Sequence, residues 1–153
     1  MKRDDVLKIQ GAEVCAGNAG VIKLPLSEFR KVMEGLRNDP QSPMDFLREI
    51  VGMDWGEEGL GAVYFMESTV TGDTVAIRTA TTDREEAYLP TVSDLWKTAL
   101  IKEREVYDFF GIRFIGHPDM RRLFLREDWI GWPLRKDYDM NSNPLRLDNE
   151  INA

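Results

Sequence analysis

The stretch from Glu103 to Gly111 constrains the fold of this chain most strongly, because it interleaves charged residues with large apolar ones. It reads EREVYDFFG and places two adjacent phenylalanines beside four ionisable side chains. A solvated helix gains nothing from adjacent phenylalanines, and an apolar core does not tolerate this many unpaired charges. These charges therefore need partners, either within the same domain or on a neighbouring protein.

Apolar residues at helical spacing predict a helix over residues 91–110. Residues 91–94 resemble a capping box, and Gly111 suits the C-terminal cap. Four residues beyond Ala99, on the apolar face of this helix, stands Glu103. An unpaired carboxylate at that position would cost several kcal/mol or would stay protonated. We therefore expect Glu103 to meet a positive group or several hydrogen-bond donors, with an arginine as the favoured partner.

Candidate cations for Glu103 lie further along the chain, at Arg121, Arg122, Arg126 and Arg135. On the helix itself, Arg104 and Asp108 stand four residues apart and are predicted to pair along the surface, which contributes only about 0.3–0.5 kcal/mol. The alternative is that the charge run over residues 102–105 is a solvated face. That alternative suits Arg104 and Glu105 better than Glu103, because only Glu103 lies on the apolar face.

Short helices and strands are predicted upstream of this stretch. Residues 21–24 are typical of a strand, and a helix is expected from Ser27, its N-cap, to Asn38. A second helix is predicted over residues 43–50, with Gly52 as its stop signal.

A β-hairpin is the clearest element of the middle of the chain. Its strands are predicted over residues 60–69 and 74–81, with a turn at 71–73, because both runs are rich in β-branched and aromatic residues. Short extended segments are expected at 112–115 and 123–125. This order of helices and antiparallel strands predicts an α+β fold: a single two-layer domain with helices packed on one face of a small mixed or antiparallel sheet.

Three regions are expected along the chain. Residues 1–20 are glycine-rich and weakly periodic, so they are predicted to be a loosely ordered lead-in. Residues 21–138 should form the folded domain. Residues 139–153 are polar and are predicted to be an extended C-terminal tail.

Composition narrows the possible partners. The net charge is −7, with 20 basic against 27 acidic residues, which argues against nucleic acid because phosphate contacts need an excess of lysine and arginine. No apolar run approaches the roughly 18–20 residues that span a bilayer, so no direct membrane insertion is expected. A local excess of basic residues over 121–136 suits a protein partner.

Single copies of two residue types limit the chemistry. Cys15 is the only cysteine and His117 the only histidine, so neither a Cys/His zinc site nor a four-cysteine iron–sulfur cluster can be built from this chain. Cys15 lies among small residues and is expected to be a buried or half-exposed small side chain. His117 precedes a proline in a turn, where we expect it to hydrogen-bond backbone or to pair with Asp119.

An enzymatic role remains as an alternative. It would use Glu103, Asp108 and His117 as acid–base groups. Against it, no serine or cysteine nearby completes a nucleophilic arrangement, and no glycine-rich phosphate loop is present.

Two blocks of this sequence together resemble the signature of the 30 kDa subunit, also called the C subunit, of the proton-translocating NADH–quinone oxidoreductase, respiratory complex I. The first block contains Glu103, Arg104, Glu105, Asp108, His117 and Arg121. The second contains Trp132, Pro133, Leu134, Arg135, Lys136 and Asp137. A weaker resemblance over residues 46–54 extends the match to roughly residues 20–138.

The resemblance implies a non-catalytic member of the peripheral arm. Such a protein scaffolds the quinone-reducing module by docking on the 49 kDa-like D subunit and on neighbouring peripheral-arm subunits. It carries no cofactor itself, because NADH, FMN, the iron–sulfur clusters and quinone belong to other subunits. The second block and the tail are expected to lie against the D subunit. The implied location is the cytoplasmic side of the cell inner membrane, held peripherally through the complex.

Other settings stay open at this point. Related subunits occur in membrane-bound hydrogenases and in quinone reductases without an NADH module, and the C and D subunits are fused in some bacteria. A third class is a free-standing binding module, with Trp129, Trp132 and Arg135 as its docking surface.

Overall fold

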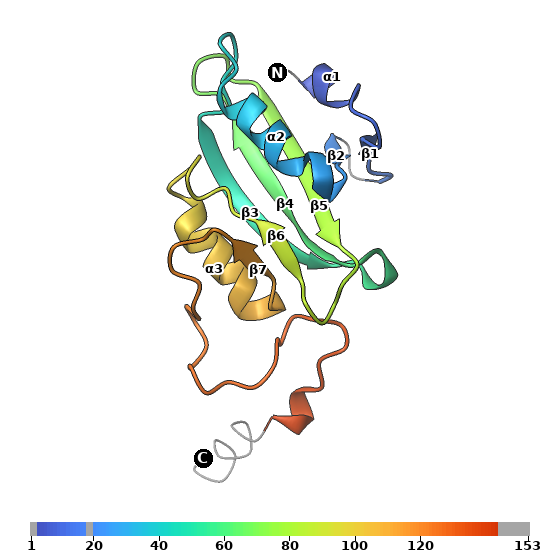
Figure 1. Cartoon of the computed structure of the whole chain (residues 1–153), viewed down its shortest axis with the longest axis vertical. Coiled ribbons are helices and arrows are strands. Elements are labelled where there is room, and N and C mark those ends of the chain that lie inside the picture. Colours follow the sequence, from blue (N-terminus) through green and yellow to red (C-terminus); the bar gives the residue numbers. More distant parts are fainter. Residues whose placement is uncertain (1–2, 18–19, 144–153) are drawn as a thin grey trace.

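A five-stranded mixed sheet forms the centre of the molecule, with strand order β1-β2-β5-β4-β3 (Figure 1). The computed structural model describes residues 3–17 and 20–143. β2 and β5 pair in parallel, and the other neighbours in the sheet pair antiparallel. The strands are β1 (Glu13–Val14), β2 (Val21–Lys23), β3 (Phe46–Asp54), β4 (Leu60–Glu67) and β5 (Thr74–Thr81).

The predicted hairpin is confirmed as β4 and β5. Its register runs from Leu60 opposite Thr81 to Glu67 opposite Thr74. The connecting turn closes where the Gly72 N–H donates to the Ser68 carbonyl oxygen at 2.8 Å. Gly72 has a φ of 77°, a left-handed conformation that glycine adopts without steric cost. The predicted strand at 21–24 is confirmed as β2.

β3 overturns the prediction of a second helix over residues 43–50. The register of β3 against β4 shifts between Leu47 and Glu49, which marks an irregularity of the β-bulge kind at Arg48. The extra residue changes the phase of the alternation, so the buried side chains fall at Leu47 and Ile50. Their spacing of three imitates one face of a helix. Pairing with β4 decides the structure, and Gly52 lies inside the strand instead of ending a helix.

The helix α2 (Leu26–Arg37) lies across the sheet and confirms the first predicted helix. Its buried face consists of Phe29, Val32, Met33 and Leu36. The predicted N-cap is wrong, because Pro25 precedes the first turn and no side chain caps it. The fixed φ of proline suits a helix start, and Asn38 ends the helix as predicted.

The helix α3 (Ala99–Phe110) begins eight residues later than predicted. Residues 91–98 form turns that fold back toward α3, so the apparent capping box at 91–94 does not cap it. Gly111 ends α3 in the left-handed conformation, as predicted, with a φ of 68°. The extended segment at 112–115 is confirmed as β7 (Arg113–Ile115), which pairs in parallel with β6 (Tyr88–Pro90), a pairing that the sequence did not suggest.

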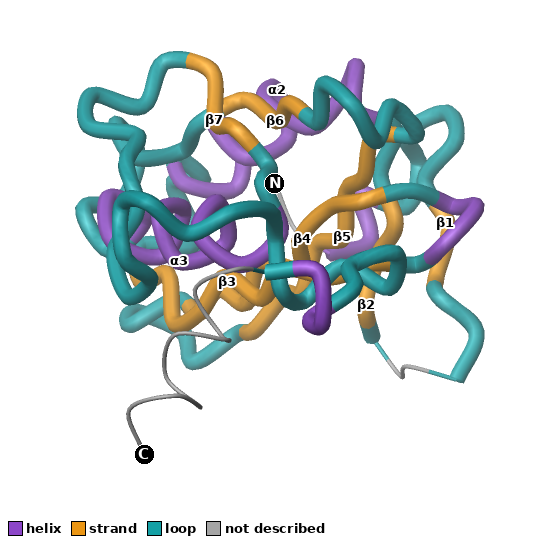
Figure 2. Tube along the Cα trace, turned by 90° about the horizontal axis from the view of Figure 1, so that it is seen from below, coloured by secondary structure: helices purple, strands orange, loops and turns teal. Residues whose placement is uncertain are grey.

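Both long helices lie on the same side of the sheet, which confirms the two-layer α+β fold (Figure 2). The rings of Phe29 on α2 and Tyr64 on β4 are 4.9 Å apart. At the other side of the layer, Val106 and Phe110 of α3 pack over Gly52, where a Cβ atom would come within 2.6 Å of the Phe110 ring. The core therefore lies between the helices and the inner face of the sheet, and the outer face carries no helix in this part of the chain.

The terminal regions contribute short elements. α1 (Arg3–Val6) places Val6 fully inside the core. Between β3 and β4 lies η1 (Gly56–Glu58), and η2 (Met140–Ser142) follows the last loop. Asn143 is buried and its side-chain amide donates to the Tyr138 hydroxyl at 2.8 Å. Residues 144–153 of the predicted tail lie outside the described residues, and the predicted region limits stay predictions.

Candidate functional site

Asp108 is the centre of the signature region. Its side chain is fully buried, and its Oδ2 atom accepts three successive backbone N–H groups, from Leu123 at 3.1 Å, Phe124 at 2.6 Å and Leu125 at 2.9 Å. Its Oδ1 atom accepts Nη1 of Arg122 at 3.0 Å. Burial opposes ionisation of Asp108, but these N–H groups and the guanidinium outweigh it and hold the pKa of Asp108 below its usual range.

Arg122 joins three parts of the chain through one guanidinium. Nη1 also donates to the carbonyl oxygen of Asp108 near the end of α3, at 2.9 Å. Nη2 donates to the carbonyl oxygens of Trp129 and Gly131, each at 2.9 Å. The guanidinium carbon lies 4.5 Å from the centre of the Trp132 ring, a cation–π contact. One side chain thus fixes a loop that has little regular secondary structure.

Arg104 does not pair with Asp108, so that prediction is wrong. Nε of Arg104 donates to the carbonyl oxygen of Arg121 at 3.2 Å, and Nη2 donates to that of Arg122 at 3.0 Å. Asp119 lies 3.7 Å from Nη1. Arg104 and Asp108 are both buried, because residues 117–125 fold back over α3 and cover the helix face that was expected to be solvated.

A second group of ions holds the segment that follows. Asp54 at the end of β3 accepts two nitrogens of Arg84, at 2.9 and 2.8 Å, and the backbone N–H of Lys136 at 2.9 Å. These contacts, with Arg84 the largest, hold the pKa of Asp54 well below its usual range. Asp137 also accepts Nη2 of Arg84, at 2.9 Å.

Arg135 completes this second group. Its Nε donates to the carbonyl oxygen of Phe110 at 2.6 Å, and Nη1 donates to that of Arg84 at 2.8 Å. The Leu134 N–H donates to the carbonyl oxygen of Phe109 at 3.1 Å. Residues 121–138, here called the anchored segment, are therefore held on α3 and β3 chiefly by guanidinium–carbonyl and carboxylate–amide hydrogen bonds. Arg84 and Asp54, two of its anchors, were missed because nothing near them in the sequence indicates their distant partners.

Glu103 is buried, as its place on the apolar face predicts, but the expected arginine partner is wrong. Oε2 accepts the Thr91 hydroxyl at 2.5 Å and Oε1 accepts the Val92 N–H at 2.7 Å. The late start of α3 explains the difference, because the turns at 91–98 deliver these donors to the carboxyl group. Burial raises the pKa of Glu103 to about 7, and the two hydrogen bonds offset only part of that effect.

His117 has the structural contacts that were expected. Its Nδ1 accepts the Asp119 N–H at 3.0 Å, so Nε2 carries the proton and donates to the Leu100 carbonyl oxygen at 3.1 Å. Burial lowers the pKa of His117. Cys15 is half-buried, as predicted.

The other signature residues lie at the surface of the same region. Glu105 pairs with Lys102 at 3.1 Å, and Arg121 pairs with Asp119 at 2.8 Å. The Trp132 ring stands 5.2 Å from that of Tyr107 and close against Gly111. Pro133 follows Trp132 and is half-buried.

The three residues of the acid–base alternative do not form a shared site. Glu103 is bound to the turn at 91–92, Asp108 to Arg122 and the loop amides, and His117 to backbone. The surface hollows on the outer sheet face and beside β3 are lined by none of the three. Their polar atoms serve the packing of the domain.

Apolar side chains project from the anchored segment. Phe124, Ile130 and Leu134 are 65%, 59% and 55% exposed, and we call them the apolar tips. The Phe124 ring stacks on that of Phe109 with centroids 5.9 Å apart. Large apolar side chains held in place at a surface are typical of protein–protein contacts.

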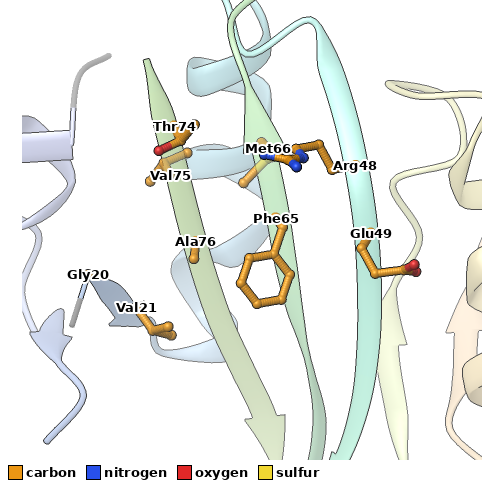
Figure 3. A pocket seen from close by; sticks show the side chains of 9 residues that line it. All are labelled: Gly20, Val21, Arg48, Glu49, Phe65, Met66, Thr74, Val75 and Ala76. Carbon is orange, nitrogen blue, oxygen red and sulfur yellow. The ribbon is translucent and has the colours of Figure 1, made fainter. Parts of the chain in front are cut away.

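A second exposed apolar area occupies the outer face of the sheet. Val51, Met53 and Phe65 are each 39% exposed there. A shallow hollow of about 650 Å³ surrounds Phe65, between Val21 on β2 and Arg48 on β3 (Figure 3). A solvated face of an antiparallel sheet normally alternates polar with buried apolar residues, and this face departs from that pattern.

The described part of the chain offers neither a membrane span nor a metal cluster. Among residues 3–17 and 20–143, no helix has the length and apolar character that crossing a bilayer requires. The same residues contain no group of three or more histidine, cysteine, aspartate or glutamate side chains arranged to hold a metal ion.

Comparison with known proteins gives concordant matches. Residues 22–144 match the family described as the respiratory-chain NADH dehydrogenase 30 Kd subunit. The chain is 59% identical to the fused C/D subunit of the NADH-quinone oxidoreductase of Phocaeicola vulgatus over 129 residues, which is 84% of this chain and 24% of that protein. It is 38% identical to the C subunit of the NADH-quinone oxidoreductase of Thermus thermophilus over 139 residues, which is 84% of this chain and 65% of that protein. The chain thus spans about a quarter of the length of the C/D relatives that it matches.

One solved structure extends the likeness to the fold. A chain of the archaeal membrane-bound sulfane sulfur reductase, described as a respiratory membrane complex, superposes with a TM-score of 0.72 at 25% sequence identity. The match covers 98% of this chain and 89% of that one.

Proposed function

The chain belongs to the 30 kDa-subunit family of the respiratory-chain NADH dehydrogenase, and from that premise we propose that it is a non-catalytic, peripheral-arm component of a proton-translocating NADH–quinone oxidoreductase. Its task is to scaffold the quinone-reducing module by docking on a D-like subunit. The single observation that carries this proposal is the anchored segment, residues 121–138. Buried ions fix its shape, while its apolar tips remain exposed.

The arrangement of charges supports a scaffolding role. Asp108, Arg122 and Arg104 direct their hydrogen bonds to backbone groups and to each other. Such contacts fix a loop before it meets a partner, which reduces the conformational entropy lost on binding. Exposed apolar side chains on a fixed loop then supply the contact area. NADH, FMN, iron–sulfur clusters and quinone are assigned in this proposal to other subunits.

The relatives named as C/D subunits support the choice of partner. In those proteins the C-like and D-like parts share one chain, so the two parts work at a shared location. The partner surface on this chain is proposed to comprise the anchored segment, including the signature residues from Trp132 to Asp137. Attachment to the membrane is proposed to be peripheral, on the cytoplasmic side of the inner membrane, through the complex.

A second setting is favoured by one observation. The solved structure that resembles this chain belongs to a sulfane sulfur reductase, so this fold also occurs in a respiratory complex with a different name and substrate. The equivalent subunit of a membrane-bound hydrogenase or a related quinone reductase is therefore the alternative function. The identity of the co-purified partners distinguishes the two.

Co-purification of the tagged protein from its native host tests the proposal. We expect the protein to bring down a D-like subunit together with subunits that hold iron–sulfur clusters. The double variant Ile130→Asp/Leu134→Asp should lose these partners, because it places charges in the apolar contact. Val70→Asp is the matched control, since Val70 is 70% exposed at the β4–β5 turn, outside the proposed surface. Partner recovery unchanged by the double variant would refute the proposed docking surface.

A further inference from the structure

Glu103 is a buried carboxyl group that the proposed scaffold does not use. Its side chain is 0% exposed and lies on the face of α3 that meets the core. Both of its hydrogen-bond partners, the Thr91 hydroxyl and the Val92 N–H, belong to the turn that precedes α3. Within the described residues its hydrogen bonds thus come from neutral donors, whereas Asp54 and Asp108 each bind an arginine.

The charged and titratable groups that face Glu103 come from three directions. Arg30 on α2 donates to the Thr91 carbonyl oxygen at 2.6 Å and also pairs with Asp94 in the 91–98 turns. The Arg30 charge favours the ionised form of Glu103, and the Asp94 charge disfavours it. From β4, the Tyr64 hydroxyl is buried and has no hydrogen-bond partner in the part of the chain that the structure describes. Burial raises the pKa of Tyr64 well above its usual range, so this hydroxyl stays neutral.

Both protonation states of Glu103 fit the same geometry. The ionised carboxylate accepts the Thr91 hydroxyl, whereas the neutral acid can donate its proton to the same hydroxyl oxygen at the same 2.5 Å separation. Thr91 has a second partner in the Ser93 hydroxyl at 2.8 Å, so its own proton can turn either way. Proton uptake therefore needs no rearrangement, and the two states differ mainly in the cost of holding a charge away from water.

We propose that Glu103 is a proton-binding group through which pH near neutrality controls how firmly α3 and the preceding 91–98 turns are held on the sheet. The neutral form is the tightly packed one. The ionised form pulls water toward the interface between α3 and the turn and weakens it. Because α3 also carries Asp108 and Arg104, the same proton affects the firmness of the anchored segment. This inference concerns regulation of the fold and does not rest on the identity of the partner.

The sign of the effect follows from the two states. Below pH 4.5, the usual pKa of glutamate, Glu103 is protonated in the folded and in the unfolded chain, and the stabilising effect is fully present. Between 4.5 and about 7 the unfolded chain ionises while the folded chain keeps its proton, so stability falls as pH rises. Over this window the unfolding equilibrium constant should rise by about 10-fold per pH unit, to about 300-fold in all.

Urea unfolding of the chain at steps from pH 4.5 to 8.5 tests the proposal, with Glu103→Gln as the neutral isostere. The ratio of the unfolding equilibrium constants, wild type over Glu103→Gln, should rise by about 300-fold across the series. Glu105→Gln is the matched control on the same helix, because Glu105 is partly exposed and paired with Lys102, and its ratio should stay flat. A wild-type to Glu103→Gln ratio that is flat within about threefold would overturn the proposal.

Titration by His117 does not imitate this result. Burial depresses its pKa, so His117 contributes stability that is lost as pH falls, which is the opposite direction. A direct measurement covers the case in which the glutamine variant does not fold. Carbon-detected NMR of the wild-type protein should show the Glu103 carboxyl carbon titrating near pH 7, and a midpoint near 4.5 would refute the proposal.

Discussion

Asp108 and Arg122 form a buried ion pair with an Nη1–Oδ1 distance of 3.0 Å, and each also binds backbone groups of the other's segment. The carboxylate caps three amides that follow Arg122, and the guanidinium caps the Asp108 carbonyl near the end of α3. The pair is therefore a reciprocal clamp between the helix and the anchored segment.

Asp108→Asn should destabilise the domain by about 3–5 kcal/mol, because it leaves Arg122 buried without its counter-ion and replaces an acceptor of three amides. Denaturant unfolding measures the change. Asp128→Asn is the control, since Asp128 forms an exposed pair with Arg126 and should change stability by less than about 1 kcal/mol. Equal effects of the two substitutions would show that the clamp contributes no more than a surface pair.

Acidification should unfold the domain through Asp54 and Asp108. Both carboxyl groups have pKa values held below the usual 3.8, so they contribute stability that is present above pH 3.8 and is lost as pH falls through their folded values. The melting temperature should fall steeply below about pH 4. In Asp54→Asn the melting temperature should start lower and fall less steeply. A wild-type melting temperature that is constant from about pH 5 to about pH 2 would contradict the assignment.

Gly111→Ala should destabilise more than Gly72→Ala. Both glycines have left-handed φ values, 68° and 77°, so each alanine carries a conformational cost of about 1–2 kcal/mol. At Gly111 the new methyl group would also come within 2.4 Å of the Trp132 indole, whereas at Gly72 it meets nothing within 4 Å. Overpacking should add about 1–3 kcal/mol at Gly111 alone. Thermal melts of the two variants check the difference, and near-equal values would mean that Trp132 moves aside freely.

Tyr64→Phe should leave stability unchanged or raise it slightly. The Tyr64 hydroxyl is buried without a hydrogen-bond partner in the described region, so its removal relieves a desolvation penalty and keeps the ring contact with Phe29. Tyr138→Phe is the comparison, since that hydroxyl donates to the Ile130 carbonyl oxygen and accepts from Asn143. It should lose about 1 kcal/mol. A loss of similar size at Tyr64 would reveal a partner for its hydroxyl.

Local patterns in the sequence predicted those elements whose structure is decided locally. The β4–β5 hairpin and the buried face of α2 follow from alternation and helical spacing within single segments. β3 was misassigned because an irregularity at Arg48 shifts the alternation, and only its register against β4 makes the strand visible. The start of α3 was placed too early for a similar reason: residues 91–98 fold back to serve Glu103 instead of extending the helix.

The candidate site was predictable in its residues but not in its pairings. Register placed Glu103 in the core, yet its donors came from the preceding turn instead of from Arg121, Arg122, Arg126 or Arg135. Arg104 and Asp108 were recognised as important, but their partners are backbone groups of residues 121–125. Carbonyl and amide partners carry no sequence signature, so guanidinium–backbone contacts of this kind become visible only in three dimensions.

The parallel pairing of β2 with β5 bears on the order of folding. β3, β4 and β5 are consecutive along the chain and can join through short loops, whereas β2 meets β5 only across a separation of about 55 residues, from Val21 to Ala76. Closing that longer loop carries the larger entropy cost, so β2, with β1 behind it, should be the last part of the sheet to assemble. Pulse-labelling hydrogen exchange during refolding should then protect amides of β4 and β5 before those of β2. A nascent chain would hold its first strand unpaired until the hairpin that receives it has formed.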